Sequence, residues 1–217
     1  MATEEITSSN AVLLPSTAVI SPTVIVKIGT EGKEYILHTE LLKHHSAYFR
    51  GALSGAFKET DDGVIPITDI ETDAFDTFVD WIYRGTVNTE PQSPSNVLSR
   101  SYILADRLIM PGLKSALMDH YYHRYTGRKR IRPSCGMIIR LCNNLPKEDP
   151  LLRLCLDIWS AQKAIYKLEE GEKAELSNLP HEFLVRLMLR MQELGEKPTA
   201  VQTFMQEDYN ERVRTDG

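Results

Sequence analysis

The sequence predicts an α+β fold, with a small sheet near the start of the chain and an all-helical second half. Short β-branched segments come first and are followed by many segments with helical periodicity. The segments between the strands leave few residues for βαβ crossovers, which argues against a doubly wound parallel sheet. The chain has 217 residues, of which 42% are hydrophobic and 25% charged, and this composition is typical of a soluble globular protein with one large or two small domains.

Three segments have the character of β-strands. "TVIVKIG" (23–29) and "KEYILH" (33–38) are separated by "TEG" (30–32), a stretch of turn residues, and together they predict a β-hairpin. "GVIPI" (63–67) predicts a third, short strand. Because Pro66 has no backbone N–H to donate, this strand is expected at an edge of the sheet. Ordered structure is expected to begin near Pro22.

Helical periodicity begins directly after the hairpin. Residues 39–53 predict two short helices that are interrupted near Ser46, which can cap the second one. The clearest helix is 72–85, where Thr72 or Asp73 caps the start and Gly85 ends it. Further helices are predicted at 96–109, 111–125, 134–143, 149–166 and 180–194.

Three strings, in order and at matching separations, resemble the BTB/POZ domain. In "ILHTELLKHHSAYFRGAL", the positions that follow that family's pattern are His38, Leu41, Leu42, Ser46 and Phe49. "IPITDIETDAFDTFVDWIYRGTV" is similar to the family's strand, acidic turn and helix that ends in Tyr-x-Gly. "YILADRLIMPGLKSALM" is similar to its Leu-Ala-Asp-x-Leu string and the last helix of the domain.

This resemblance implies a BTB/POZ fold, a small mixed sheet with a cluster of short helices, over residues 22–125. The helices at 134–195 more loosely resemble the all-helical C-terminal extension that follows the domain in many members. Residues 126–133, rich in charge with Gly and Pro, are expected to be a linker, and "EEGEKAE" within the extension a solvated connection. Residues 1–21 are expected to be a disordered tail, and 196–217 a polar tail.

Two departures from the family concern self-association. The dimeric, zinc-finger-linked members carry a buried acid on the first strand and a base just after the His, and here those positions hold Thr23 and Thr39. Those members also begin with an amphipathic helix that packs across the dimer, and residues 1–21 lack that pattern. We therefore expect only weak homo-oligomers at micromolar concentration.

The resemblance also points to a partner-binding site. In BTB members that bind a cullin scaffold, a hydrophobic-x-Glu pair lies between the second short helix and the third strand, and Phe57 and Glu59 occupy those positions. Tyr83 lies in the helix-end region that also faces the cullin in those members. An exposed aromatic can fill a pocket on a partner, and a nearby carboxylate can accept hydrogen bonds from it. The alternative is that Phe57 covers the domain's own core and Glu59 is solvated.

The sequence contains no recognisable catalytic motif. A Gly-rich phosphate loop, a Gly-x-Ser-x-Gly elbow and a His-Glu-x-x-His motif are all absent, so no catalytic residue, no cofactor and no enzymatic activity are predicted. His120 and His123 are three residues apart but lack a third ligand, so no metal site is predicted. Three cysteines at unrelated spacings, Cys135, Cys142 and Cys155, are interpreted as small buried residues.

Charge and hydropathy narrow the range of partners. The net charge is −5 and the pI about 5.7, which argues against a general nucleic-acid-binding surface. No apolar run reaches the length of a membrane span. The basic stretch "RKRIR" (128–132) is either a solvated linker, a phosphate-binding patch or a nuclear import signal. The expected location is cytoplasmic, nuclear or both, and free cysteines suit a reducing compartment.

The sequence therefore predicts a protein-interaction module. The favoured function is an adaptor that binds a cullin-type ubiquitin ligase scaffold through the domain and presents a cargo, with the helices at 134–194 as the candidate cargo surface. The alternative is a BTB assembly or regulatory protein, nuclear through 128–132, with no link to a ubiquitin ligase. Nothing in the sequence identifies the cargo.

Overall fold

The computed structural model describes most of the chain, in seven stretches. These are residues 15–54, 63–88, 95–127, 131–162, 168, 170–195 and 204–210. The chain divides into two compact units, Met1–Ile70 and Glu71–Gly217, and each is described by itself.

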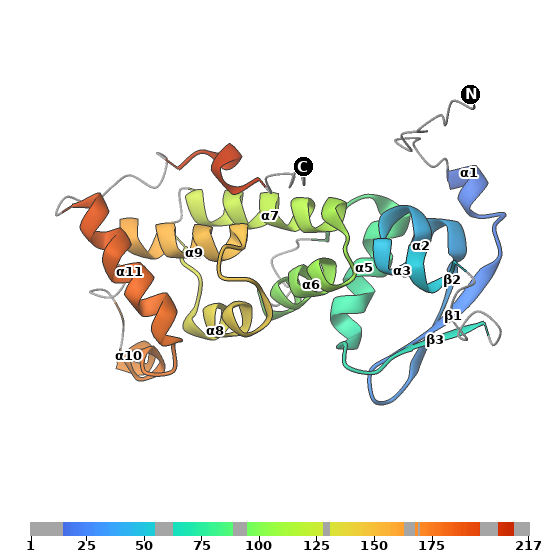
Figure 1. The fold of residues 1–217 in the computed structure, drawn as a ribbon, viewed down its shortest axis with the longest axis horizontal. Helices are drawn as coiled ribbons and strands as arrows, with labels where there is room; N and C mark the ends of the chain where they lie inside the picture. The colour runs from blue at the N-terminus through green and yellow to red at the C-terminus, as the bar shows by residue number, and fades with distance from the viewer. Residues whose placement is uncertain are drawn as a thin grey trace, which may run out of the picture. The chain divides into compact units, whose positions relative to one another are not determined.

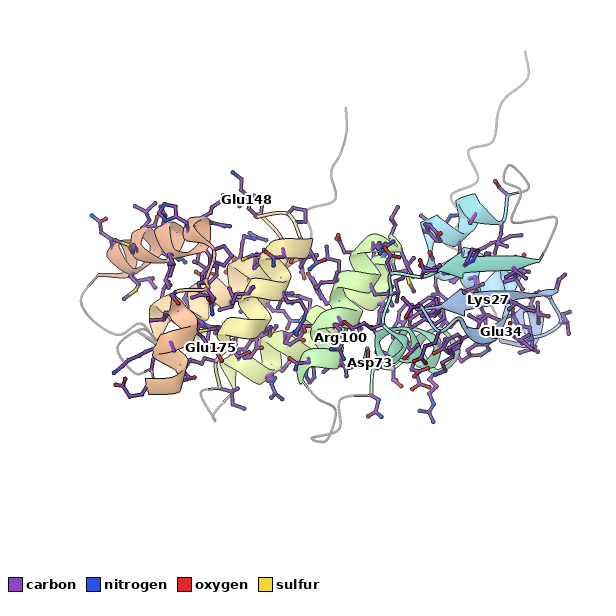
Figure 2. All side chains as sticks on the ribbon, turned by 90° about the horizontal axis from the view of Figure 1, so that it is seen from below. Lys27, Glu34, Asp73, Arg100, Glu148 and Glu175 are labelled. Carbon is purple, nitrogen blue, oxygen red and sulfur yellow. The ribbon has the colours of Figure 1, made fainter. Side chains whose placement is uncertain are left out.

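The first unit contains a three-stranded mixed sheet (Figure 1). Its strands are β1 (Thr23–Ile28), β2 (Lys33–His38) and β3 (Val64–Ile67), in the order β2-β1-β3. β1 pairs antiparallel with β2 and parallel with β3, so the predicted hairpin and the predicted edge strand are both confirmed. On the outer face, Lys27 and Glu34 form an ion pair of 2.9 Å between neighbouring strands (Figure 2).

The inner face of the sheet packs against two short helices, α2 (Thr39–His45) and α3 (Ala47–Ala52) (Figure 1). Ser46 separates them, and its hydroxyl accepts a hydrogen bond of 3.2 Å from the backbone N–H of Phe49. The predicted break at Ser46 is therefore confirmed, with the predicted cap. The core of this unit combines alternate strand residues with residues of the two helices: Val24, Val26, Ile28, Leu37, Leu41, Leu42, Phe49, Ile65 and Ile67.

Ordered structure begins earlier than the sequence suggested. A short helix, α1 (Pro15–Ala18), precedes β1, and Ala18 is completely buried. The hydroxyl of Ser21 donates to the carbonyl oxygen of Ala18 at 2.8 Å and accepts from the backbone N–H of Glu40 at 3.4 Å. The expectation of a disordered tail up to residue 21 is therefore wrong for residues 15–21, because these contacts fix the segment against α2.

The second unit is built from helices. They are α5 (Thr72–Arg84), α6 (Ser95–Arg107), α7 (Pro111–Thr126), α8 (Cys135–Asn144), α9 (Pro150–Ala161), α10 (Glu170–Leu176), α11 (His181–Leu194) and the 3₁₀ turn η3 (Gln206–Tyr209). α6 packs on α5, α7 and α8, and α9 packs on α7 and α11 (Figure 1). Among the described residues this unit contains no strand, so the α+β fold with a helical second half is confirmed.

Three local expectations for this unit need correction. The stretch expected as a solvated connection forms α10, which is held to the rest of the unit by an ion pair between Arg132 and Glu172. The cap position of α5 is Glu71 rather than Thr72 or Asp73. The expected polar tail contains η3, in which Tyr209 is buried.

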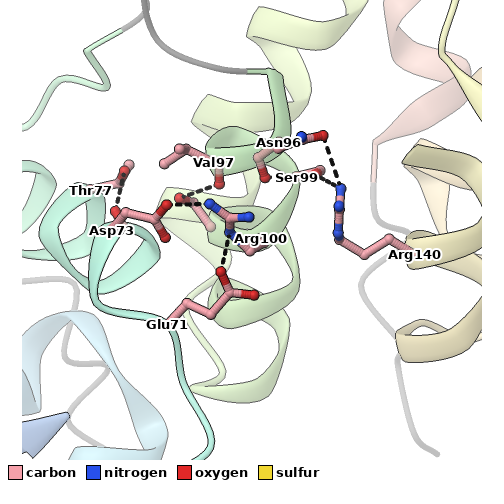
Figure 3. Close-up of polar contacts among 9 residues, drawn as sticks. Glu71, Asp73, Thr77, Asn96, Val97, Ser99, Arg100 and Arg140 are labelled. Carbon is pink, nitrogen blue, oxygen red and sulfur yellow. Dashed lines mark hydrogen bonds and ion pairs between the residues drawn. The ribbon is translucent and has the colours of Figure 1, made fainter. Parts of the chain in front are cut away.

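Two arginines connect helices of this unit (Figure 3). Arg100 on α6 forms an ion pair of 2.9 Å with Glu71 and a second with Asp73, both at the start of α5. Arg140 on α8 donates a hydrogen bond of 3.0 Å to the hydroxyl of Ser99 on α6. These contacts set the position of α5 relative to α6, and of α6 relative to α8.

Trp81 on α5 packs closely over Gly112 in the first turn of α7. A Cβ atom at position 112 would lie 2.9 Å from Cη2 of Trp81 and 3.1 Å from Cζ2. The indole is only 9% exposed, so it has little room to move away. We expect Gly112→Ala to lower the free energy of unfolding by about 1–3 kcal/mol, the usual cost of overpacking, as measured by chemical denaturation.

Gly136, in the first turn of α8, provides a matched control. A Cβ atom there meets no other atom within 4 Å, and the residue has a helical conformation. Gly136→Ala is therefore expected to stabilise the protein by up to about 1 kcal/mol, because alanine restricts the unfolded chain more than glycine does. Equal effects of the two substitutions would show that Trp81 does not restrict position 112.

Candidate partner-binding surface

Tyr83 lies in the last turn of α5 with its side chain 43% exposed. Its neighbours Trp81 and Ile82 are buried, because the helical period directs them to the opposite side. The helix ends at Gly85, which adopts a left-handed conformation with φ of 70° and donates its N–H to the carbonyl oxygen of Trp81 at 2.8 Å. The aromatic ring is thus presented from a helix end with a fixed geometry.

Phe57 and Glu59 lie outside the described residues. Of the three predicted contact residues, the described part of the chain contains Tyr83 alone. The exposure of Tyr83 suits a contact residue, but whether Phe57 and Glu59 join it in one surface remains a prediction.

A groove with a volume of about 1010 Å³ lies between the end of α6, the start of α7, the start of α9 and the segment 204–210. Its walls combine aromatic and charged side chains, including Tyr102, Asp106, Lys114, Arg153 and Tyr209. Three of the charged side chains in its wall, Asp106, Lys114 and Asp149, pair with one another.

Lys114 is 7% exposed and lies between two carboxylates. Its Nζ atom is 2.6 Å from Oδ1 of Asp106 on α6 and 3.0 Å from Oδ2 of Asp149 at the start of α9. The ammonium group also lies 5.4 Å from the centre of the Tyr102 ring, within the range of a cation–π interaction. A buried ammonium group needs such partners, because its desolvation costs several kcal/mol.

Asp149 is the most buried charged residue of this network, with a side chain that is 1% exposed. Its Oδ1 atom accepts hydrogen bonds from the hydroxyl of Tyr102 at 3.1 Å and from the backbone N–H of Leu151 at 2.8 Å. The second of these bonds caps α9. The same carboxylate therefore fixes the start of α9 and holds it against α6 and α7.

Sequence reasoning missed this network. The pair Asp149-Pro150 has the form of a helix start, with an acidic cap followed by proline in the first turn, and that part was accessible from the sequence. Nothing marks Lys114 as buried, since lysine on an amphipathic helix normally faces solvent.

The cysteines and titratable clusters give no sign of catalytic chemistry in the described residues. Cys135 and Cys155 are buried as predicted, but Cys142 is only half-buried. Burial raises the pKa of all three thiols, so they stay protonated and poorly nucleophilic near neutral pH. Within the described ranges, no group of three His, Cys, Asp or Glu side chains is placed to hold a metal ion. The helices described there are also too short or too polar to cross a bilayer.

The BTB/POZ family model matches residues 20–124. These residues form a BTB/POZ domain. The match starts just before β1 and runs almost to the end of α7, so it includes the hairpin, the paired short helices, β3, α5 and α6. The recognition made from the three sequence strings is thereby confirmed. The boundary between the two compact units, at Ile70 and Glu71, falls inside this match.

Two curated proteins illustrate what this chain is similar to. The human Kelch repeat and BTB domain-containing protein 4 is 26% identical over 188 residues, which cover 86% of this chain and 33% of that protein. Kelch-like protein 24a of Danio rerio is 35% identical over 60 residues, covering 28% of this chain and 10% of its own length. The chain thus spans about a third of the length of the human relative. The longer alignment exceeds the BTB/POZ match, so similarity continues into the helical extension.

A solved structure also matches in part. The BTB domain of human Gigaxonin aligns with a TM-score of 0.39 and 18% sequence identity, covering 52% of this chain and 97% of that one.

Removing the positive charge of Lys114 tests the buried network around Asp149. We expect Lys114→Met, which keeps the side-chain length, to lower the free energy of unfolding by about 3–5 kcal/mol, because it leaves the Asp149 carboxylate buried without a counter-charge. Chemical denaturation measures the change. The control is Lys147→Met, which breaks an exposed ion pair of 3.6 Å with Glu182 and is expected to cost less than about 1 kcal/mol.

The double variant Lys114→Met with Asp149→Asn separates a charge effect from a packing effect. It removes both charges and is expected to recover part of the lost stability. If Lys114→Met lowers the free energy of unfolding as little as Lys147→Met does, the buried carboxylate of Asp149 does not need Lys114 as its counter-charge.

Proposed function

We propose that this protein is an adaptor that binds a cullin-type ubiquitin ligase scaffold through its BTB/POZ domain and presents a cargo bound by its helical extension. BTB/POZ domains are protein-interaction modules, and residues 20–124 form one. The similarity to a human protein that carries both Kelch repeats and a BTB domain extends over domain and extension together. That combination supports an adaptor in which the BTB/POZ domain binds the scaffold and the helical extension binds the cargo.

The observation that carries this proposal is the exposure of Tyr83 at the end of α5. Aromatic side chains that stand out from a rigid element are the typical anchors of protein interfaces, because they bury a large area at a small cost in conformational entropy. Buried Trp81 and the left-handed Gly85 hold the helix end that presents this ring. In the proposed complex Phe57 supplies a second anchor, and Glu59 accepts hydrogen bonds from the scaffold and favours correct docking.

The helical extension is the proposed cargo-binding part. It contains α8, α9, α10 and α11, and the buried contact between Lys114 and Asp149 joins α9 to the last helix of the BTB/POZ domain. A cargo held by these helices would keep a defined position relative to α5 and Tyr83, since all of them belong to the second unit. This is the geometry that an adaptor needs.

Titration of the full chain with a purified cullin N-terminal domain tests the proposal. Phe57→Ala is expected to weaken binding by about 2 kcal/mol or more, as for hot-spot aromatics, and Tyr83→Ala by about 1–2 kcal/mol. Tyr83→Ala is expected to change the free energy of unfolding by only about 0.5 kcal/mol, because the side chain is exposed. Glu59→Ala is expected to act mainly through the association rate.

Met188→Ala is the matched control, because Met188 on α11 is a large apolar residue that is 68% exposed and lies outside the BTB/POZ domain. It is expected to leave cullin binding unchanged. If Phe57 is a core residue, Phe57→Ala will instead destabilise the fold by about 3–5 kcal/mol. If the unmodified protein does not bind the cullin domain, the ligase role is wrong and the assembly or regulatory role takes its place.

A further inference from the structure

Residues 204–210, "FMQEDYN", form a short segment that docks on three helices of the second unit. η3 lies against α7 and α9 (Figure 1, dark red). The guanidinium carbon of Arg190 on α11 lies 5.9 Å from the centre of the Phe204 ring. Phe204 is 6% exposed and Tyr209 is 3% exposed, whereas Met205 between them is 59% exposed. The segment therefore has two buried aromatic anchors, five residues apart, joined by a turn in which Met205, Glu207 and Asp208 are exposed and Gln206 is half-buried.

Side chains of the helices hold the segment at three points. The hydroxyl of Tyr122 on α7 donates to the carbonyl oxygen of Phe204 at 2.8 Å. The side-chain amide of Gln206 donates to Oδ1 of Asp119, also on α7, at 2.6 Å. The hydroxyl of Tyr209 donates to Oδ2 of Asp157 on α9 at 2.8 Å. Among the described residues, no backbone group of the helices takes part in these hydrogen bonds.

The receiving surface, made of α7, α9 and α11, has packing of its own that does not involve the segment. Trp159 of α9 meets Phe183 of α11 edge to face, with ring centres 6.3 Å apart. Asp157 forms an ion pair of 2.6 Å with Arg190 of α11 through its other oxygen, so it would keep a counter-charge if Tyr209 left. The surface is thus expected to persist when the segment is detached.

The segment is also organised by its own contacts. The carboxylate of Asp208 accepts from the backbone N–H of Met205 at 3.2 Å, and the N–H of Asp208 donates to the carbonyl oxygen of Met205 at 3.1 Å. Burial and the neighbouring Asp157 carboxylate raise the pKa of Tyr209, so its hydroxyl stays protonated and able to donate. A short peptide with the same residues can therefore form the same turn and the same contacts.

We propose that the surface of α7, α9 and α11 is a docking site for a short peptide, which residues 204–210 occupy in the free protein. The partner it fits is a protein segment with phenylalanine and tyrosine five residues apart, an amide side chain two residues after the phenylalanine and acidic residues on the outward side of the turn. Such a segment binds by displacing residues 204–210, and these act as a built-in competitor. The site involves neither Phe57, Glu59 nor Tyr83, so it is independent of cullin binding.

Competition in the full chain tests this site. The probe is a fluorescent peptide with the sequence of residues 200–212, and its binding is followed by anisotropy. The detached variant carries Phe204→Ala and Tyr209→Ala, which remove both anchors and leave the helices unchanged. Because a tethered competitor acts at a high effective concentration, the probe is expected to bind the detached variant at least about tenfold more tightly than the unmodified chain.

Three comparisons make the result specific. Met205→Ala, which changes an exposed residue of the same segment, is expected to bind the probe like the unmodified chain. A probe with phenylalanine in place of the tyrosine loses the hydrogen bond to Asp157 and is expected to bind the detached variant several-fold more weakly. Tyr122→Phe in the detached variant removes the hydrogen bond to the carbonyl oxygen of the phenylalanine. It is expected to weaken binding of the original probe several-fold as well.

Two results would overturn the proposal. One is equal binding of the probe to the unmodified chain and the detached variant. The other is loss of cooperative thermal unfolding in the detached variant, which would make residues 204–210 an integral part of the core. The assay contains no cullin, so a failure here is distinct from a failure of the proposed ligase role.

Discussion

The carboxylate of Asp149 is almost completely buried, and the arrangement of the helices around it depends on the ammonium group of Lys114, 3.0 Å away. A buried carboxylate without a counter-charge would cost several kcal/mol, so α9 can start at this point only when α7 is already in place. The hydroxyl of Tyr102 on α6 supplies a further contact to the same carboxylate. The last helices of the BTB/POZ domain and the first helices of the extension are therefore parts of one structure, consistent with a compact unit that begins inside the domain at Glu71.

Because the last helices of the BTB/POZ domain and the helices of the extension form one compact unit, the two proposed contact surfaces keep fixed positions relative to each other. The exposed ring of Tyr83 belongs to α5, and the proposed peptide site belongs to α7, α9 and α11, all within one compact unit. Arg100 connects α5 to α6 (Figure 3), and α6 packs in turn on α7, so the two proposed contact surfaces are linked through a series of packed helices. A partner at one surface would thus be held in a defined geometry relative to a partner at the other.

Most of the fold could be predicted from the sequence because its signals are local. Two strand-like segments separated by turn residues predicted the hairpin, and a serine between two helical segments predicted the break at Ser46. A glycine after a periodic helix predicted the helix end at Gly85. Contacts between segments that are distant in the sequence have no comparable local sequence signal. Phe204 and Tyr209 are isolated aromatics in a polar stretch, and their burial is decided by helices more than ten residues away. Ile109 adopts a left-handed conformation with φ of 51°, which a β-branched residue rarely does, and the sequence gives no sign of it.

The claim that α7 and α9 form one cooperative structure is tested most directly by hydrogen exchange of the unmodified protein in increasing, sub-denaturing concentrations of denaturant. Mass spectrometry of peptides from the two helices reports the free energy at which each one opens. If the contact between Lys114 and Asp149 unites them, the protected amides of α7 and α9 will converge on a single opening free energy with the same denaturant dependence. Opening of α9 at a clearly lower free energy, while α7 stays protected, would contradict the account.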